Sequence, residues 1–456
     1  MSRIALISEH ASPLAMLGGV DSGGQNVYVG QLARHLASFG HEVDVFTRRD
    51  RADLPGVVAW ADGARIVHVA AGPAARVPKE DLLPYMGEFA ASVLATCRRR
   101  GAYDLIHANF FMSALVACDV KRAAGTPFVV TFHALGRVRR LHQGGADAFP
   151  DERLAIEHRA VAEADGLIAE CPQDEEDLTR LYRADPAKIA TIPCGFDPGE
   201  FWPIAKARAR AALGLDPDEK IVLQLGRLVP RKGVDTVVRG LARLRREHRV
   251  AARLLIVGGE SEAPDPEITP EIGRLRALAE SEGVADAVTF VGSRGRDALR
   301  YYYGAADVFV TTPWYEPFGI TPVEAMACGT PVVGAAVGGI KSTVLDGATG
   351  YLVPPNDPDA LADRLARLYG RPELLRLFGR QAARRANEMF TWDRVSREVE
   401  GFYGHATDGR VRASGAAESA RDHRSRPILP LGGLARAEST PRGESTGVRR
   451  RRRSSL

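Results

Sequence analysis

Short apolar stretches alternate with longer segments of helical pattern through the first half of the chain. The apolar stretches are residues 4–8, 43–47, 66–70, 104–108, 128–132, 167–169 and 189–192. Strands that alternate with helices in this way are typical of βαβ units around a parallel sheet. The first half therefore predicts a parallel α/β domain.

The pattern breaks at residues 193–203, where Pro193, Gly195, Pro198 and Pro203 favour a turn or linker over a helix. A second series of strand-like stretches follows at residues 221–225, 254–257, 288–291, 308–311 and 331–334, again with helical patterns between them. We expect a second parallel α/β domain after the linker.

Two helical patterns, at residues 359–369 and 372–403, follow the last strand-like stretch, and the composition then turns rich in Arg, Ser, Gly, Ala and Pro. Such a composition favours disorder. The predicted organisation is a first Rossmann-like domain, a second Rossmann-like domain, a C-terminal helix and a disordered basic tail, at residues 1–200, 201–385, 386–404 and 405–456 respectively.

The composition, 45% hydrophobic and 26% charged over 456 residues, is that of a globular protein with more than one buried core. No apolar stretch approaches the roughly 18 residues of a membrane span, and the chain starts with a strand-like stretch rather than a secretion signal. We expect a cytoplasmic protein. Its five scattered cysteines lack zinc-type spacing and are expected to be small buried residues.

The formal net charge of +4 is unevenly distributed along the chain. From His405 onward there are twelve Arg and five acidic residues, a net +7, which leaves −3 for residues 1–404. This balance argues against nucleic acid as a partner of the folded part. The run Arg449 to Arg453 could contact phosphate-rich partners or a membrane surface weakly, although a solvated tail is the simpler interpretation.

A glycine-rich segment, GGVDSGGQN at residues 18–26, lies between the first predicted strand and a helical pattern. Glycines there let the backbone approach a ligand, and free amides at a helix start favour anions. The segment lacks the GxGxxG spacing of a dinucleotide fingerprint, which argues against a dehydrogenase.

The second domain opens with the segment GRLVPRKG at residues 226–233, directly after its first predicted strand. Loops at the carboxyl ends of parallel strands are where α/β folds bind ligands. Arg227 offers a fork of donors and Lys232 a compact charge, which together suit a diphosphate. An exposed basic turn is the alternative.

The most specific segment is WYEPFGITPVE at residues 314–324, which also follows a predicted strand. Pro322 is tolerated in the first turn of a helix, so the amides of Phe318, Gly319 and Ile320 would point at an anionic ligand. Glu316 would precede this helix and Glu324 would lie about one turn inside it. Two carboxylates placed this way can bind two different hydroxyl-bearing parts of one ligand.

These motifs, with GTPVV at residues 329–333 and Gly338-Gly339, resemble the large GT-B family of retaining glycosyltransferases. The resemblance covers about residues 1–404. It implies two Rossmann-like domains that face an interdomain cleft and the transfer of a hexosyl unit from a nucleotide-diphosphate sugar to an acceptor hydroxyl. It also implies that no metal or other cofactor is required.

The resemblance assigns site roles residue by residue. Arg227 and Lys232 would hold the donor diphosphate, Glu316 the hydroxyls of the transferred sugar, and Glu324 the nucleotide ribose. Gly23 and Gly24 would close over the phosphates from the first domain, and His133 would line the reacting centre opposite them. Without the resemblance, a lone histidine after a strand is usually structural.

The departing nucleoside diphosphate gains negative charge, so preplaced cations and amides stabilise the transition state more than the ground state. The resemblance implies front-face attack, in which a donor phosphate oxygen takes the proton of the acceptor. Arg227, Lys232, His133 and Glu316 are therefore the predicted catalytic residues, with Glu316 as a sugar-binding residue rather than a nucleophile.

The acceptor is expected to be a small phosphorylated sugar or polyol, with UDP-glucose or a related UDP-sugar as donor. Lys79 and Arg153 match positions that hold an acceptor phosphate in the family members that act on inositol phosphate, and Asn26 matches an acceptor contact. Gln25, together with Arg137, resembles the members that make sucrose phosphate. Phe110 and Ala134 depart from the pattern, because they replace polar phosphate ligands.

Other functions stay open at this point. A transferase that uses GDP-mannose or another UDP-sugar, with a neutral glycan or a lipid-linked acceptor, has the same motifs. A non-catalytic sugar-nucleotide sensor or a nucleotide-sugar epimerase could share the architecture, because fold alone does not fix function.

Overall fold

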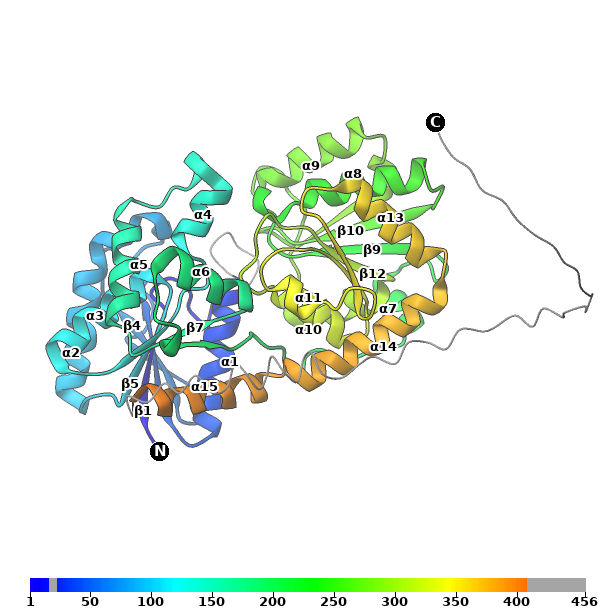
Figure 1. Ribbon diagram of the computed structural model, residues 1–456. Helices are drawn as coiled ribbons and strands as arrows, with labels where there is room; N and C mark the ends of the chain where they lie inside the picture. Colours follow the sequence, from blue (N-terminus) through cyan, green and yellow to red (C-terminus); the bar gives the residue numbers. More distant parts are fainter. Residues whose placement is uncertain (16–22, 408–456) are drawn as a thin grey trace, which may run out of the picture. The chain divides into compact units, whose positions relative to one another are not determined.

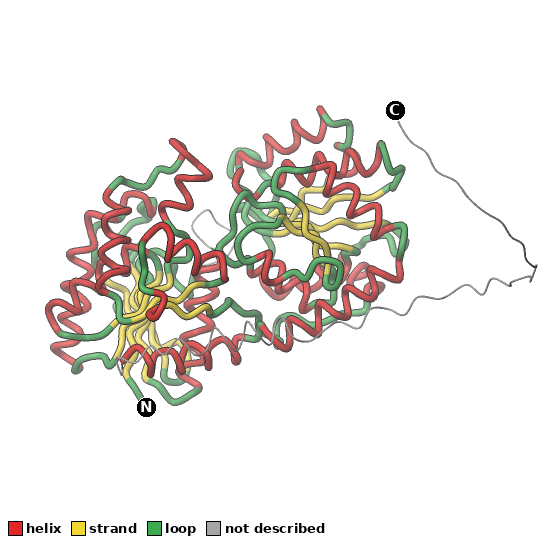
Figure 2. The backbone as a smooth tube through the Cα atoms, viewed as in Figure 1, coloured by secondary structure: helices red, strands yellow, loops and turns green. Residues whose placement is uncertain are grey.

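The computed structural model describes residues 1–15 and 23–407, all of which belong to one compact unit that contains two β-sheets. Figures 1 and 2 show each sheet with helices packed around it. The predicted glycine-rich segment lies outside the described residues from 18 to 22. The predicted tail lies outside them from residue 408 onward, and so does the Arg449 to Arg453 run.

The first sheet has eight strands in the order β3-β4-β2-β1-β5-β6-β7-β8. Their bounds are β1 Arg3–Ile7, β2 Glu42–Arg48, β3 Val57–Ala61, β4 Ala64–Val69, β5 Leu105–Asn109, β6 Phe128–Thr131, β7 Gly166–Ala169 and β8 Ile189–Thr191. All neighbouring pairs are parallel except β3 and β4, which form an antiparallel pair at one edge. The carboxyl ends of the parallel strands therefore lie along one rim.

The helices of the first domain cover both faces of this sheet, because alternate strand residues are apolar on each face. The helices are α1 Gly24–Ser38, α2 Met86–Arg100, α3 Phe111–Ala124, α4 Gly136–Gln143, α5 Glu152–Glu163 and α6 Pro172–Tyr182. Leu6 and Val45 pack with α1 on one face, whereas Ile7 and Phe46 pack with α2 and α3 on the other. Two apolar layers thus hold the strand ends in place.

The second sheet has six parallel strands in the order β11-β10-β9-β12-β13-β14. They are β9 Lys220–Leu225, β10 Ala252–Val257, β11 Val288–Gly292, β12 Val308–Thr311, β13 Val332–Ala335 and β14 Gly350–Val353. Leu223 and Val323 share one apolar layer, and Val222 and Leu241 share the other. The order changes direction between β9 and β12, which is the point where α/β sheets bind ligands.

The helices of the second half are α7 Lys206–Leu213, α8 Val234–Arg246, α9 Pro270–Ser281, α10 Arg296–Ala305, α11 Ile320–Ala327, α12 Ile340–Thr343, α13 Pro358–Tyr369, α14 Pro372–Met389 and α15 Trp392–Thr407. Short 3-10 helices also occur, among them η1 Lys79–Asp81 and η5 Pro230–Lys232. The pattern predicted over residues 372–403 is two helices, because the helical backbone is interrupted at Phe390.

Helix α15 returns the chain to the first sheet. The Tyr403 hydroxyl lies 2.7 Å from Nδ1 of His107 on β5, and the ring of Trp392 packs edge-on against Tyr28 of α1 with centroids 5.7 Å apart. At the start of α15, the backbone N–H of Trp392 donates to Phe196 in the predicted linker. The C-terminal helix is therefore part of the first domain's packing.

The predicted fold of two parallel-sheet α/β domains is confirmed. Two strands were missed, β3 and β14, which both lie at sheet edges. All five cysteines are buried, as expected. Among residues 1–15 and 23–407, no helix has the length and apolar character needed to cross a membrane.

Candidate active site

The two most specific sequence motifs form loops at the carboxyl ends of β9 and β12, and these loops contact each other. The N–H of Trp314 donates to the carbonyl of Arg231 at 2.9 Å, and the Thr312 hydroxyl donates to the carbonyl of Gly233 at 2.7 Å. Gly233 has a φ of +63°, and a Cβ at this position would lie 1.9 Å from the Thr312 carbonyl oxygen. Only glycine fits this close approach, which places Lys232 beside Glu316.

Lys232 and Glu316 form an ion pair through Nζ and Oε2, and both side chains are largely buried. Burial lowers the pKa of Lys232 to about 8, with Arg231 and Arg227 acting in the same direction and Glu316 opposing them. Burial alone would raise the pKa of Glu316, but Lys232, Arg231 and Arg227 lower it on balance. Glu316 is therefore a carboxylate surrounded by three cations.

Helix α11 begins directly after this pair, with Gly319 as its N-cap at a φ of +91°. Pro322 lies in its first turn, as predicted, where no backbone N–H is needed. The loop that precedes the helix is crowded, since a Cβ on Gly338 would lie 1.8 Å from the carbonyl oxygen of Glu316. Free amides at this helix start suit an anion such as a phosphate.

Glu324 lies inside α11 and is 2% exposed. Its Oε2 accepts the Tyr303 hydroxyl at 3.0 Å, and its Oε1 lies 3.2 Å from Nη1 of Arg296. Burial raises the pKa of Glu324, although Arg296 and Tyr303 act in the opposite direction. Arg296 also donates from Nε to Glu200 in the linker at 2.8 Å, so this end of the site is tied to the segment between the domains.

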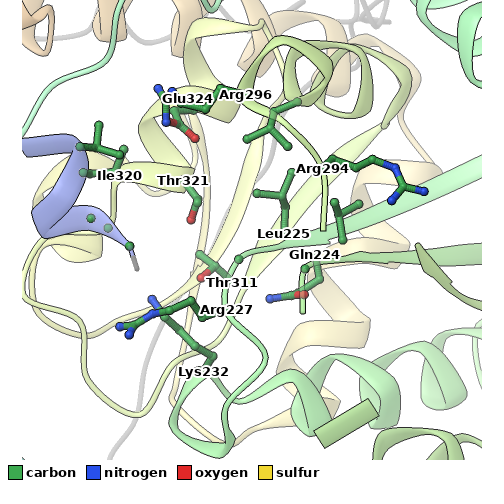
Figure 3. Close-up of a pocket in the computed structure, with 18 of the residues that line it drawn as sticks. Gln224, Leu225, Arg227, Lys232, Arg294, Arg296, Thr311, Ile320, Thr321 and Glu324 are labelled. Atoms are coloured by element: carbon green, nitrogen blue, oxygen red, sulfur yellow. The ribbon is translucent and has the colours of Figure 1, made fainter. Parts of the chain in front are cut away.

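The smaller of two adjoining cavities, about 180 Å³ in volume, connects these groups. Figure 3 shows Arg227 and Lys232 at one end of it and Glu324 beside Arg296 at the other. The start of α1 also lines the cavity. A Cβ on Gly23 would lie 3.3 Å from Nε of Arg227, and one on Gly24 would lie 3.5 Å from Cδ1 of Ile320. The structure thus brings together the residues predicted to bind the donor.

The larger cavity, about 690 Å³, shares Gly23, Gly24, Arg227 and Glu316 with the smaller one. Its first-domain wall includes Gln25, Asn26, Lys79 and His133 among the predicted residues. The aromatic side chains that line it are Phe110, Phe149, Trp314, Tyr315 and Phe318. The two cavities therefore meet at residues that were predicted to bind the donor.

His133 follows β6 at a φ of +57°, which is unusual for a residue with a side chain. Its Nδ1 lies 2.9 Å from Oε1 of Glu170, and its Nε2 lies 3.0 Å from Oδ1 of Asn109. The ring also packs edge-on against Tyr28, with centroids 4.9 Å apart. These contacts hold the imidazole in one orientation at the cavity wall.

Gln25 and Asn26 make hydrogen bonds inside the first domain. Gln25 Nε2 donates to the Ser8 hydroxyl and to the carbonyl of Asn109, both at 3.2 Å. Asn26 accepts the Gly23 N–H at 2.9 Å and donates to the carbonyl of Ser12 at the same distance. Both residues therefore shape the loop at the start of α1.

The three predicted acceptor cations lie in different environments. Lys79 on η1 lines the larger cavity, with Nζ 3.8 Å from Glu80. Arg137 is exposed and lies 3.0 Å from Nε2 of His158. Arg153 is 1% exposed, and its Nε donates to Glu157 at 2.8 Å. Neither arginine is among the described residues that line the two cavities.

Arg153 is enclosed by aromatic rings. Its Cζ lies 4.9, 4.8 and 4.6 Å from the ring centroids of Phe110, Phe111 and Phe149. Within the described part of the chain, Nη1 of Arg153 has no hydrogen-bond partner. The acceptor role of Arg153 stays a prediction.

Several cavity residues were not predicted from the sequence. They are His10, Arg139, Glu170 and Arg231 around the larger cavity and Arg296 beside Glu324. Arg231 lies inside the GRLVPRKG motif and could have been found there. Arg139 and Glu170 lie in segments without a recognised motif, so no local signal marked them.

Within residues 1–15 and 23–407, no group of three or more His, Cys, Asp or Glu side chains is arranged to hold a metal ion. The positive groups described at the cavities are side chains.

Comparisons with known proteins agree with this geometry. The family model described as Glycosyl transferases group 1 matches residues 205–385, and the model described as Glycosyltransferase Family 4 matches residues 22–200. The D-inositol 3-phosphate glycosyltransferase of Actinosynnema mirum is 40% identical over 415 residues, covering 90% of this chain and 98% of the relative. The chain belongs to the group 1 glycosyltransferases.

Solved structures show the same two-domain GT-B fold as this glycosyltransferase. Sucrose-phosphate synthase from Thermosynechococcus elongatus has a TM-score of 0.82 at 36% identity, over 89% of this chain and 99% of that one. HepE from Anabaena, in complex with UDP-glucose, has a TM-score of 0.68 at 20% identity, over 88% of this chain and 99% of that one. The family resemblance expected from the motifs is confirmed.

Proposed function

We propose that this glycosyltransferase moves a hexosyl unit, with retention of anomeric configuration, from UDP-glucose or a related UDP-sugar to a hydroxyl of a sugar phosphate or polyol phosphate. The observation that supports it most directly is the meeting of the two cavities at Arg227 and Glu316. One cavity contains cations and a helix start, which suit a diphosphate. The other adds Lys79, Arg139 and Arg231 among aromatic rings, which suit an anion attached to a ring.

In the proposed reaction, Arg227, Lys232 and the amides at the start of α11 stabilise the negative charge that develops on the diphosphate. The bond between the sugar C1 and the phosphate oxygen breaks, and the acceptor oxygen bonds to C1 on the same face. The acceptor proton passes to the departing phosphate oxygen. Glu316 binds sugar hydroxyls and Glu324 the ribose. Retention and these residue roles rest on the family resemblance.

The names of the relatives support a phosphorylated acceptor. The relatives include several D-inositol 3-phosphate glycosyltransferases, and the structural neighbour at 36% identity is a sucrose-phosphate synthase. A phosphorylated acceptor would place its negative charge near Lys79. Phe110 and Ala134 line the same cavity without an ionic side chain, so the acceptor contacts would differ from those of the inositol-phosphate members.

A donor and acceptor panel tests the proposal. UDP-glucose, UDP-N-acetylglucosamine and GDP-mannose would each be incubated with inositol 3-phosphate, hexose 6-phosphates and the matching unphosphorylated compounds. Mass spectrometry would detect products, and the anomeric proton coupling would give their configuration. We expect a product with retained configuration from a UDP-sugar and a phosphorylated acceptor. An inverted product would exclude retention, and a preference for neutral acceptors would favour a glycan or lipid-linked acceptor.

The proposal also predicts that the activity does not depend on a metal ion, because the proposed cations are side chains. Turnover should survive dialysis against EDTA. Loss of activity that magnesium or manganese restores would show that a metal does this work. A protein that binds the donor and yields no product with any acceptor would instead be a sugar-nucleotide sensor. The cytoplasmic location stays a prediction.

A further inference from the structure

A glutamine interrupts an apolar strand beside the smaller cavity. Strand β9 lies inside the second sheet, between β10 and β12, where both faces are covered by apolar layers. Gln224 is on the same face of β9 as Val222, because side chains alternate along a strand, and it pairs with Ile256 of β10 in the parallel register. Both neighbours are at most 1% exposed. The pattern of β9 favours an apolar residue at position 224, and the chain has an amide there.

The Gln224 amide is buried and incompletely bonded. Gln224 is 4% exposed, and within the described part of the chain its Oε1 has no hydrogen-bond partner. A buried acceptor without a partner destabilises a folded protein, and such a group calls for a physical explanation. An apolar side chain of similar size would fill the position without that penalty. The amide therefore suits a contact that the protein itself does not supply.

The position of Gln224 near the carboxyl end of β9 brings it to the smaller cavity. Gln224 and Leu225 are on opposite faces of the sheet, yet both line this cavity, because it lies over the end of the strand. Figure 3 shows Gln224 on the cavity wall between Arg294 and Arg227. A ligand in the smaller cavity is therefore within reach of the amide.

The part of the ligand that meets Gln224 follows from the proposed function, on which this step rests. Arg227 and Lys232 would hold the diphosphate of the donor, and Glu324 its ribose. Nη1 of Arg294 donates to two backbone carbonyls of the second domain, at 2.9 and 2.7 Å, so this nitrogen is already bonded within the protein. The base is left with the remaining wall, which is formed by Gln224, Leu225, Val257, Gly258 and Ser293.

We propose that Gln224 binds the base of the nucleotide donor through its side-chain amide. An amide presents an acceptor oxygen and two donor hydrogens. Uracil has matching groups, since its N3–H lies beside a carbonyl oxygen on each side. Oε1 of Gln224 accepts the N3–H, and Nε2 donates to a neighbouring carbonyl. The buried amide destabilises the ligand-free protein, and the bound base satisfies it.

The test is calorimetric titration of UDP into the full-length protein and into Gln224→Met. Methionine is unbranched and flexible, so it fills the space of glutamine without the amide. We expect Gln224→Met to bind UDP on the order of 10-fold more weakly, as for a lost hydrogen bond that leaves its partner unpaired. Ribose 5-diphosphate, which lacks the base, should displace UDP from both proteins with equal affinity. An unchanged UDP affinity, or an equal loss for ribose 5-diphosphate, would overturn the proposal.

The stability of the ligand-free protein separates binding from a structural role. Removal of an unpartnered buried amide should leave the urea midpoint of Gln224→Met unchanged or raise it. A lower midpoint would show that the amide stabilises the fold itself, and it would contradict the proposal.

Gln381→Met is the matched control. Oε1 of Gln381 on α14 also lacks a partner among the described residues, but Gln381 is not one of the described residues that line the smaller cavity. This variant should bind UDP as the wild type does. Equal losses of UDP affinity in Gln224→Met and Gln381→Met would overturn the proposal.

The proposed function and this contact can fail separately. If the wild type binds UDP but forms no product with any acceptor, the proposed transfer fails, while the titrations still decide the role of Gln224. If the wild type binds GDP rather than UDP, the UDP-sugar donor is wrong. The same variants titrated with GDP, whose base also has an N–H beside a carbonyl, then decide the contact. A wild type that binds no nucleoside diphosphate would contradict both.

Discussion

The two domains line the cavities with charge in different ways. In the second domain, cations and carboxylates lie in direct contact, as in the pairs Lys232–Glu316 and Arg296–Glu324, and two short loops supply most of them. In the first domain, Arg153 and Arg139 also pair with carboxylates, those of Glu157 and Asp147, but Arg153 is in addition enclosed by three aromatic rings. Arg153 lies over Phe110, Phe111 and Phe149, and Arg139 lies 4.9 Å from the Phe149 centroid.

This difference suggests how the two walls respond to ligands. An ion pair such as Lys232–Glu316 can open and give its cation to a phosphate and its carboxylate to sugar hydroxyls. A guanidinium enclosed by three rings and a carboxylate is fixed, so it supports the shape of the wall. The donor side is therefore expected to exchange partners on binding, whereas the acceptor side relies on a preformed surface.

The largest expected effect tests whether Arg153 is structural. Arg153→Ala would leave Glu157 buried without its cation, and breaking a buried pair in this way costs about 3–5 kcal/mol of the free energy of unfolding. Urea denaturation of the full chain would measure it. The exposed Arg137→Ala is the control and should change this free energy by less than about 0.5 kcal/mol. A stable Arg153→Ala with a raised acceptor KM would show that Arg153 contacts the acceptor instead.

Removing a cation from the proposed site of the donor phosphates is expected to change the free energy less, but to lower the turnover strongly. Arg227→Ala or Lys232→Ala should lower turnover by on the order of 100-fold or more, because each removes a preorganised charge from the leaving group. Steady-state kinetics would measure it, with circular dichroism to verify folding. Lys220→Ala, an exposed lysine at the start of β9, is the matched control. Near-normal turnover in both variants would contradict the proposal that Arg227 and Lys232 bind the donor diphosphate.

These two sites also show how far sequence reasoning could reach. The convergence of the residues predicted to bind the donor could be foreseen, because each motif directly follows a strand of the parallel sheet, so that Arg227, Lys232, Glu316 and Glu324 meet at the carboxyl ends of neighbouring strands. The enclosure of Arg153 was not predictable, since two of its three rings, Phe110 and Phe111, come from the distant junction of β5 and α3, whereas only Phe149 lies near it in the sequence. No spacing in the chain indicates that they meet.

The missed elements have physical reasons of their own. Strand β3 is half-exposed and pairs on one side with β4, so it lacks the continuous apolar run of a buried parallel strand. Strand β14 has four residues and starts at a glycine. Glu170 was missed because its partner His133 is 37 residues away and a glutamate after a strand has no distinctive pattern.

The comparison is sharpened by Lys79, the predicted acceptor cation that lines the larger cavity. Lys79→Ala should raise the acceptor KM by roughly 10- to 150-fold, the range expected when a charge-assisted contact of about 1.5–3 kcal/mol is lost. Initial rates at saturating donor would measure this change. An unchanged KM would place the acceptor's negative charge elsewhere, with Arg139 and Arg231 as the next residues to test.

The smallest expected effect is a pH dependence of donor binding. Because the pKa of Lys232 in the free protein is about 8, its charge is present below that pH and is lost above it. The Kd for UDP should therefore rise by up to about tenfold per pH unit above 8. The ordinary pKa of lysine, 10.5, lies above the folded value, so this group makes folding more favourable as pH rises from about 8 to 10.5.

The opposite pH dependences of UDP affinity and of folding stability distinguish weaker UDP binding from unfolding of the protein. A loss of affinity above pH 8 would accompany an unchanged or increased contribution of Lys232 to stability, and thermal melts at each pH would verify this. Lys232→Arg, which keeps its charge over this range, should remove the pH dependence. If it persists in that variant, another group is responsible.

The most direct test of a donor site in the second domain and an acceptor site in the first is calorimetric titration of UDP, without acceptor, into Lys232→Ala and Lys79→Ala. We predict that Lys232→Ala weakens UDP binding by at least about 10-fold, as expected for the loss of a charge-assisted contact, and that Lys79→Ala binds UDP as the wild type does. Equal losses in both variants, or a loss confined to Lys79→Ala, would contradict this division.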